Sequence, residues 1–241
     1  MTTTYDAFLG GLVHAHQPAK GYRAGVDAVL LAASVPVRAD ERVLELGCGV
    51  GVPSLCVAAR EPRVKITGVE LQPEYADLAE KNGLDVVRTD LRDLPAHLRN
   101  RQFHHVMMNP PYFDRAAGSA APDQGRDVAM GGDTALADWV RIGTSRLAPK
   151  GYLTMINRIE RLPEALTAID HRLGSIRVLP IAARTQRAPH LFILQARHSG
   201  RAPFVMLPAL VMHEGASHDG DRESYTAQLR GILRNGDTLL L

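Results

Sequence analysis

The sequence predicts an α/β fold, a Rossmann-like and mostly parallel sheet of seven strands with helices on both faces. Three observations lead to this class. Apolar runs typical of strands alternate with helical segments along the 241 residues, a glycine-rich turn follows the first run, and acidic residues end the second and third. Because 45% of the residues are apolar, the chain can fill one sizeable core. We therefore expect a single domain over residues 1–241.

The predicted elements follow one another as strand–helix–strand units. Pro53 suits the first turn of a helix, where a missing N–H costs little, and Gly83 is placed to end the next helix. Only 183–189 separate the last two strands, which predicts a hairpin and one antiparallel strand. The expected strands are 42–46, 64–71, 85–91, 103–108, 151–158, 175–182 and 190–197, and the expected helices are 52–60, 73–82, 134–147 and 163–173.

Two segments flank or interrupt this alternation. Residues 1–40 precede the first strand, and we expect them to cover the substrate and the cofactor of a core formed by 41–241, which ends in a further strand and helix. Residues 114–132 are rich in Ala, Gly, Asp and Pro and have no periodicity. A long irregular loop in a compact domain is usually functional, and its place after the fourth strand favours a substrate lid.

The net charge of +2 does not identify a partner, but its distribution is uneven. Residues 151–201 hold eight arginines and three acids, a local charge of +5, which leaves −3 for the remainder. Such a surface could face phosphates. It could equally reflect a composition rich in arginine, since only four of the 28 basic residues are lysines.

Several classes of protein are disfavoured. We find no signal-peptide pattern, and the most apolar window, 26–37, is too short to span a bilayer. Cys48 and Cys56 give neither a disulfide framework nor a metal-ligand spacing. His14 and His16 could share one face of a strand, but a third metal ligand is not nearby. We therefore expect a cytoplasmic protein without a membrane partner or a metal, and we leave the oligomeric state open.

A glycine-rich turn, Glu45-Leu46-Gly47-Cys48-Gly49-Val50-Gly51, ends the first strand and begins a helix. Glycine lets the chain turn tightly and lets a ligand approach the backbone. A dinucleotide site would want a third glycine at the sixth position of this pattern, where Val52 stands instead. A bound nucleoside fits better than a dinucleotide.

Acidic residues follow at the ends of the next two strands. Glu70 could accept hydrogen bonds from both ribose hydroxyls, and Asp90 from an adenine amino group with Leu91 beside the ring. Ligands of open α/β sheets lie beyond the carboxyl ends of the strands, so these residues should converge with the glycine turn. Alternatively, Glu70 and Asp90 merely cap neighbouring helices.

This set of motifs resembles the class I methyltransferases. The resemblance implies the seven-stranded sheet of these enzymes, with one antiparallel strand, and the cofactor S-adenosyl-L-methionine. It also implies that the glycines face the methionine part of the cofactor and that the acidic residues bind its ribose and adenine. The residues implied to bind the cofactor are Glu45, Gly47, Cys48, Gly49, Gly51, Glu70, Leu71, Asp90, Leu91 and Asn109.

Asn109-Pro110-Pro111-Tyr112 follows the fourth strand. An aromatic amine is a poor nucleophile, and acceptors on Asn109 and the Pro110 carbonyl can bind its two N–H groups as positive charge develops. Tyr112 can stack on the base. The motif resembles the [DNS]-P-P-[YFW] signature of amino- and amide-nitrogen methyltransferases, which implies that Asn109, Pro110, Pro111 and Tyr112 are catalytic. Relatives often have Phe-Asp where this chain has Phe103-His104.

The signature leaves the substrate open among adenine N6, guanine N2 of ribosomal RNA and glutamine N5 of release factors. The block 21–31 resembles the bacterial methyltransferase small-domain family, which includes adenine-N6 enzymes acting on valine tRNA. It implies RNA, first of all tRNA, as the partner. A glutamine-N5 enzyme, a guanine-N2 enzyme and a non-catalytic RNA-binding module remain alternatives. Asp27 is also placed to cap a helix beginning at Ala28. The expected substrate-binding residues are Arg23, Asp27, Tyr112, Phe113 and Arg187.

Overall fold

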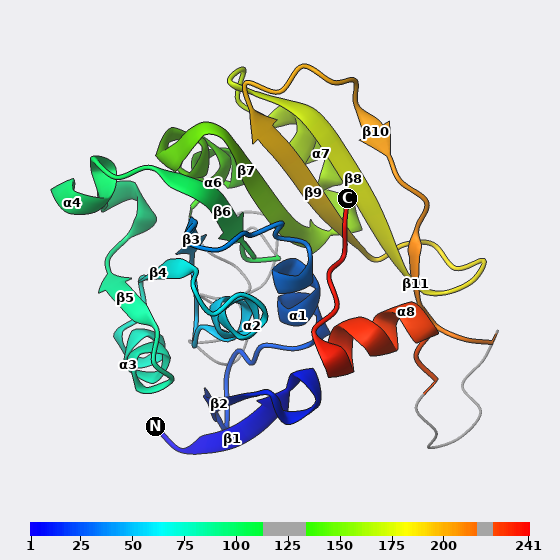
Figure 1. Cartoon of the computed structure of the whole chain (residues 1–241), viewed down its shortest axis with the longest axis horizontal. Coiled ribbons are helices and arrows are strands. Elements are labelled where there is room, and N and C mark those ends of the chain that lie inside the picture. The colour runs from blue at the N-terminus through cyan, green and yellow to red at the C-terminus, as the bar shows by residue number, and fades with distance from the viewer. Residues whose placement is uncertain (113–133, 216–223) are drawn as a thin grey trace.

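The computed structural model describes residues 1–112, 134–215 and 224–241 (Figure 1). A nine-stranded sheet has the order β10-β8-β9-β7-β6-β3-β4-β5, with β11 paired to β8. Its strands are β3 Arg42–Leu46, β4 Lys65–Glu70, β5 Asp85–Arg88, β6 Phe103–Met108, β7 Leu147–Arg158, β8 Leu173–Arg184, β9 Leu191–His198, β10 Val205–Met206 and β11 Leu210–His213.

The predicted α/β class is confirmed, and β9 runs antiparallel between β7 and β8. The sheet has nine strands rather than seven, because both β10 and β11 pair in parallel with β8, where only one further strand was expected. The prediction of 85–91 was also too long, since β5 ends at Arg88. The expected lid at 114–132 lies outside the described residues.

The side chains of each strand belong alternately to two apolar layers, one on each face of the sheet, because successive residues of a strand face opposite sides. Val43 and Ile193 pack with the helices α1 and α2, and Leu44 and Leu194 pack with α6 and α7. Figure 1 shows α1 and α2 in front of the strands. The helices are α1 Val26–Ala33, α2 Val52–Arg60, α3 Pro73–Lys81, α4 Ala96–Arg99, α6 Leu136–Arg146, α7 Leu162–Thr167 and α8 Ala227–Arg230.

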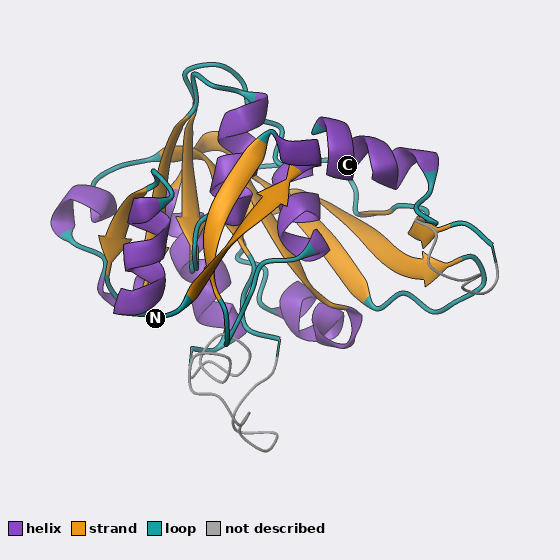
Figure 2. Cartoon of the chain, turned by 90° about the horizontal axis from the view of Figure 1, so that it is seen from below, coloured by secondary structure: helices purple, strands orange, loops and turns teal. Residues whose placement is uncertain are grey.

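The N-terminal segment begins with a hairpin of its own, β1 Thr3–Phe8 and β2 Val13–Pro18, separate from the main sheet (Figure 2). Its following helix α1 starts at Val26 rather than Ala28, and Gly25 rather than Asp27 is the N-cap. No helix of the described ranges is long and apolar enough to cross a membrane.

Parallel register brings the ends of the central strands together. Leu46 of β3 lies opposite Val69 of β4 and Met108 of β6. The residues that follow these strands therefore meet at one edge of the sheet, which is where ligands of open α/β sheets bind.

Candidate active site

A cavity of about 220 Å³ lies at this edge. Its walls come from the loops after β3, β4, β5 and β6, together with residues of the N-terminal segment and α6. The predicted convergence of the motifs is therefore seen in the structure. The predicted cofactor residues that line the cavity are Glu45, Gly47, Cys48, Gly49, Glu70, Leu71, Asp90, Leu91 and Asn109.

The glycines of the turn differ in what they contact. Gly47 has φ +65, and a Cβ there would lie 2.5 Å from Trp139 Cη2. Gly49, with φ +55, has only one atom within 4 Å of an added Cβ, and its N–H donates to Glu70 Oε2 at 2.8 Å. Gly51 is not in the cavity lining. It faces Leu84, whose Cδ2 would lie 2.9 Å from an added Cβ, so packing explains this glycine.

Two buried carboxyl groups stand at the cavity. Glu45 is 2% exposed and accepts a hydrogen bond from Ser54 Oγ, and burial raises its pKa to about 8. Glu70 accepts backbone N–H groups from Gly49 and Gln72, and burial raises its pKa as well. The two Glu70 oxygens have more acceptor sites than these backbone groups use, so the carboxyl group can also accept a hydroxyl group of a ligand.

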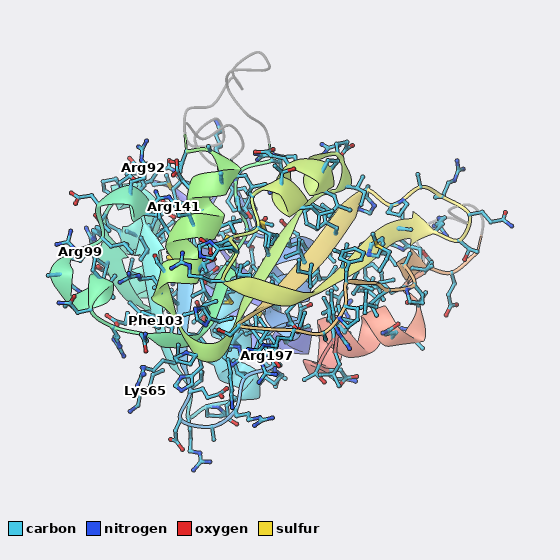
Figure 3. All side chains as sticks on the ribbon, turned by 90° about the horizontal axis from the view of Figure 1, so that it is seen from above. Lys65, Arg92, Arg99, Phe103, Arg141 and Arg197 are labelled. Carbon is cyan, nitrogen blue, oxygen red and sulfur yellow. The ribbon has the colours of Figure 1, made fainter. Side chains whose placement is uncertain are left out.

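Asp90 caps a short helical turn, as the alternative considered for it expected, and it also lines the cavity. Its side chain accepts the backbone N–H of Arg92, which caps the turn 91–93, and it forms an ion pair with the Arg92 guanidinium at 2.6 Å. This hydrogen-bonded partner lowers the pKa of Asp90. Both residues line the cavity, and Figure 3 shows Arg92 at the surface of the molecule.

The lining fits S-adenosylmethionine. The lining holds three carboxyl groups, those of Glu45, Glu70 and Asp90, and one guanidinium, that of Arg92, which Asp90 engages. The cofactor carries a sulfonium and an ammonium group against one carboxylate, and a cation bound there would favour the ionised forms of the Glu45 and Glu70 carboxyl groups. The pyrophosphate of a dinucleotide would instead meet acidic groups. The described residues form no group of three or more His, Cys, Asp or Glu that could hold a metal ion.

Asn109 is held in one orientation at the end of β6. Its Nδ2 donates to Asp27 Oδ2 at 2.9 Å and to the Tyr22 hydroxyl at 3.2 Å. An ionised carboxylate only accepts hydrogen bonds, so the amide nitrogen must face Asp27. The opposite atom, Oδ1, is buried without a hydrogen-bond partner among the described residues. Asn109 thus keeps one unused acceptor.

The following residues of the motif are held as well. Tyr112 donates its hydroxyl to Asp27 Oδ2 at 2.6 Å, and burial raises its pKa. Asn157 Nδ2 donates to the Pro110 carbonyl at 3.0 Å, and Arg161 donates to the Pro111 carbonyl at 2.6 Å. The Pro110 oxygen, which was expected to bind an amine, therefore has one lone pair in use and one left.

A second cavity, of about 680 Å³, adjoins the first, since Tyr22 and Asn109 line both. Of the predicted substrate residues, Arg23, Asp27 and Tyr112 line it. Phe113 lies outside the described residues, and Arg187 lines neither cavity. The sequence did not identify Tyr22, Arg158, His190, Leu191 and Met212 as parts of this wall.

The arginine-rich segment does not form one continuous surface. Arg158 reaches the second cavity, whereas Arg172 pairs with Asp170 at 2.7 Å. Arg197 packs over the Tyr152 ring at 5.4 Å, far from Arg92 in Figure 3. Arg184 donates to backbone carbonyls near the end of β11. Only part of the predicted basic surface is therefore close to the site.

Comparison with known proteins adds a family. The model of the methyltransferase small domain family matches residues 23–180, well over half of the chain. The chain belongs to this family. The matched range begins at the wall of the second cavity and contains both the glycine turn and the Asn109 motif.

This methyltransferase small domain protein is similar to curated tRNA methyltransferases. The tRNA1(Val) (adenine(37)-N6)-methyltransferases of Yersinia enterocolitica and Yersinia pestis are 39% and 38% identical to it over 115 residues, 44% of this chain. The match covers 45% and 46% of those relatives, so the chain spans about half the length of the proteins it resembles.

Solved structures support the fold. A predicted O-methyltransferase from Agrobacterium tumefaciens has a TM-score of 0.71 at 24% identity, covering 89% of this chain and 99% of that chain. A 16S rRNA N2 methyltransferase from T. thermophilus, in complex with AdoMet and guanosine, has a TM-score of 0.56 at 18% identity, covering 84% and 46%.

Proposed function

We propose that this protein is an S-adenosylmethionine-dependent methyltransferase that acts on an exocyclic amino nitrogen, with adenine N6 of tRNA as the first candidate. The observation that carries this proposal is the buried Asn109 Oδ1, which has no hydrogen-bond partner in the described ranges and belongs to a residue that lines both adjoining cavities. One cavity takes the cofactor and the other takes the base.

The acceptors in the site select an amino group. Asn109 Oδ1 and the free lone pair of the Pro110 carbonyl can accept the two N–H groups of an arylamine. The bound cofactor supplies a methyl group activated by its sulfonium. As the nitrogen attacks, positive charge grows on it, and fixed acceptors stabilise that charge without reorganising. Asp27 and Asn157 keep these acceptors in place.

An RNA base is the substrate that best suits the second cavity. Its wall supplies a phenol ring, Tyr112, and the cationic or titratable groups of Arg23, Arg158 and His190. Aromatic rings stack on bases, and guanidinium groups position phosphates. The names of the relatives favour tRNA and adenine N6 within this class.

Methyl transfer from labelled cofactor tests the proposal. The protein is incubated with unmodified tRNA, with ribosomal RNA and with polypeptide, with and without RNase, and the products are digested to nucleosides. We expect label in N6-methyladenosine from tRNA. Label in N2-methylguanosine would change the base, and RNase-resistant label in protein would overturn the RNA substrate in favour of a glutamine-N5 enzyme.

The Asn109→Ala variant tests the role of Asn109 in the reaction. It should retain cofactor binding, measured by calorimetry, but lose roughly 100- to 1000-fold in turnover, the usual effect of removing a fixed electrostatic acceptor or donor. Equal turnover in the variant would refute the role of Asn109.

A further inference from the structure

The N-terminal hairpin carries a group of rings on its outer face. Antiparallel pairing places Tyr5 opposite His16 and Ala7 opposite His14, so these residues share one face. The Tyr5 ring lies 5.3 Å from the His14 ring at an interplanar angle of 20°, and 4.7 Å from the His16 ring at 41°. We call Tyr5, His14 and His16 the hairpin ring cluster.

The cluster is open to solvent although its hairpin is firmly anchored. Tyr5 is 63% exposed, His14 is exposed beside it, and His16 is half-buried. The inner face, by contrast, buries Val13, Ala15 and Gln17. A large aromatic side chain on the outer face therefore contributes little to the core, and its ring remains available to a partner.

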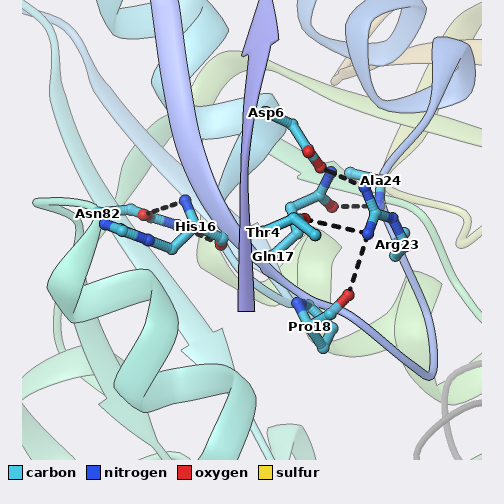
Figure 4. Close-up of polar contacts among 8 residues, drawn as sticks. All are labelled: Thr4, Asp6, His16, Gln17, Pro18, Arg23, Ala24 and Asn82. Carbon is cyan, nitrogen blue, oxygen red and sulfur yellow. Dashed lines mark hydrogen bonds and ion pairs between the residues drawn. The ribbon is translucent and has the colours of Figure 1, made fainter. Parts of the chain in front are cut away.

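The hairpin is tied directly to the wall of the second cavity (Figure 4). Arg23, which lines that cavity, donates to Thr4 and to the Pro18 carbonyl and pairs with Asp6 at 2.5 Å. On the other side, Asn82 bonds both the N–H and the carbonyl of His16. The ring cluster is thus held at a fixed place relative to the substrate cavity.

We propose that the hairpin ring cluster stacks with unpaired bases of the RNA whose target nucleotide enters the second cavity. Phenol and imidazole rings offer flat faces to any base. Asp6 is the only acid in residues 1–26, and Gln17 and Arg23 engage its carboxylate on the inner side, so the hairpin itself places no carboxylate beside the rings. This inference rests on RNA being the substrate.

Binding of fluorescent single-stranded RNA of about 12 nucleotides, and of the same strand in a duplex, tests the cluster. Tyr5→Ala should weaken single-strand binding roughly 5- to 50-fold and duplex binding by less than about twofold, because stacking needs unpaired bases. Tyr5→Phe should bind like the wild type. Leu12→Ala removes a 69% exposed apolar side chain from the same hairpin without removing a ring and should also have no effect.

Photochemical crosslinking of the wild-type protein to the same single-stranded RNA gives a second readout, which does not require any variant to fold. We expect the crosslinked peptide to contain Tyr5 or a histidine of the cluster. Wild-type affinity in Tyr5→Ala, an equal loss in Leu12→Ala, or crosslinks that avoid the hairpin would each overturn the inference. If tRNA is methylated equally well without Tyr5, the role of the cluster in RNA binding is overturned and the proposed reaction stands. If RNA binding depends on the cluster but no methylation occurs, the proposed reaction is overturned and the role of the cluster stands.

Discussion

Asp27 Oδ2 accepts hydrogen bonds from both the Asn109 amide, at 2.9 Å, and the Tyr112 hydroxyl, at 2.6 Å. These partners are 82 and 85 residues away in the sequence. One carboxylate of the N-terminal segment therefore determines which atom of Asn109 remains available as an acceptor.

Asp27→Asn tests this arrangement with almost no change in shape. The new side chain can also donate, so it no longer requires the Asn109 nitrogen to face it, and the unused acceptor loses its fixed position. We expect kcat to fall roughly 10- to 100-fold with little change in cofactor affinity. Asp138→Asn, at a partly exposed ion pair with Arg141, is the control. An unchanged kcat in Asp27→Asn would show that Asn109 is oriented by other groups.

Asn157→Ala removes the partner of the Pro110 carbonyl. Asn157 is fully buried, so the variant leaves a buried carbonyl with one bond fewer and should lose about 1–3 kcal/mol of unfolding free energy. Turnover should fall about 10-fold because the carbonyl is no longer fixed. Chemical denaturation and steady-state kinetics measure the two effects, with Asn100→Ala as the control at an exposed site. A loss of stability with unchanged turnover would limit Asn157 to a structural role.

Gly47→Ala should disrupt the cofactor cavity. The new Cβ would lie 2.5 Å from Trp139, and the backbone has φ +65, so both the ring and the turn must move. Gly83→Ala is the matched control, because it has φ +92 but no atom within 4 Å of the added Cβ. Both variants should lose about 1–2 kcal/mol of unfolding free energy from backbone strain. Only Gly47→Ala should weaken cofactor binding, by more than about 10-fold; equal weakening in both would indicate strain alone.

Glu45→Gln should change how stability depends on pH. Burial raises the pKa of Glu45 from 4.5 to about 8, so between these values the folded state holds a proton that the unfolded state has lost. The free energy of unfolding contributed by this group therefore falls as pH rises, with a slope approaching about 1.4 kcal/mol per pH unit. Denaturation of the free protein between pH 5.5 and about 7.5 should show a flatter dependence in Glu45→Gln than in the wild type. The exposed Glu74→Gln should retain the wild-type slope, and parallel slopes in all three proteins would contradict the assignment.

Much of the fold and of the site was predictable because short sequence motifs indicate them. The glycine turn, Glu70 and the Asn109 motif each follow an apolar strand, and parallel register brings such positions to one edge. The strands that were predicted wrongly or missed also have physical explanations. β10 has two residues and β11 has four, too short for a periodic pattern, and β7 begins before Pro149 and Gly151, which usually indicate a turn.

The site residues that escaped sequence reasoning depend on tertiary contacts. Tyr22 reaches Asn109 across 87 positions, and Asn157 reaches Pro110 across 47. Trp139 lies within the expected helix 134–147, but nothing in the sequence indicated that it packs on Gly47 at the cavity. Arg187 was selected for its charge, and charge along the chain did not show which arginines face the cavities.

Tyr22 and Asn109 form a wall common to the two cavities. Molecules bound on either side of such a wall are energetically linked, because each changes the surface that the other meets. If the bound cofactor changes the affinity for the base by some factor, thermodynamic reciprocity requires that the bound base changes the affinity for the cofactor by the same factor. In the proposed reaction a positively charged sulfonium becomes a neutral thioether beside this wall, so the same linkage would couple the escape of the spent cofactor to the presence of the methylated base.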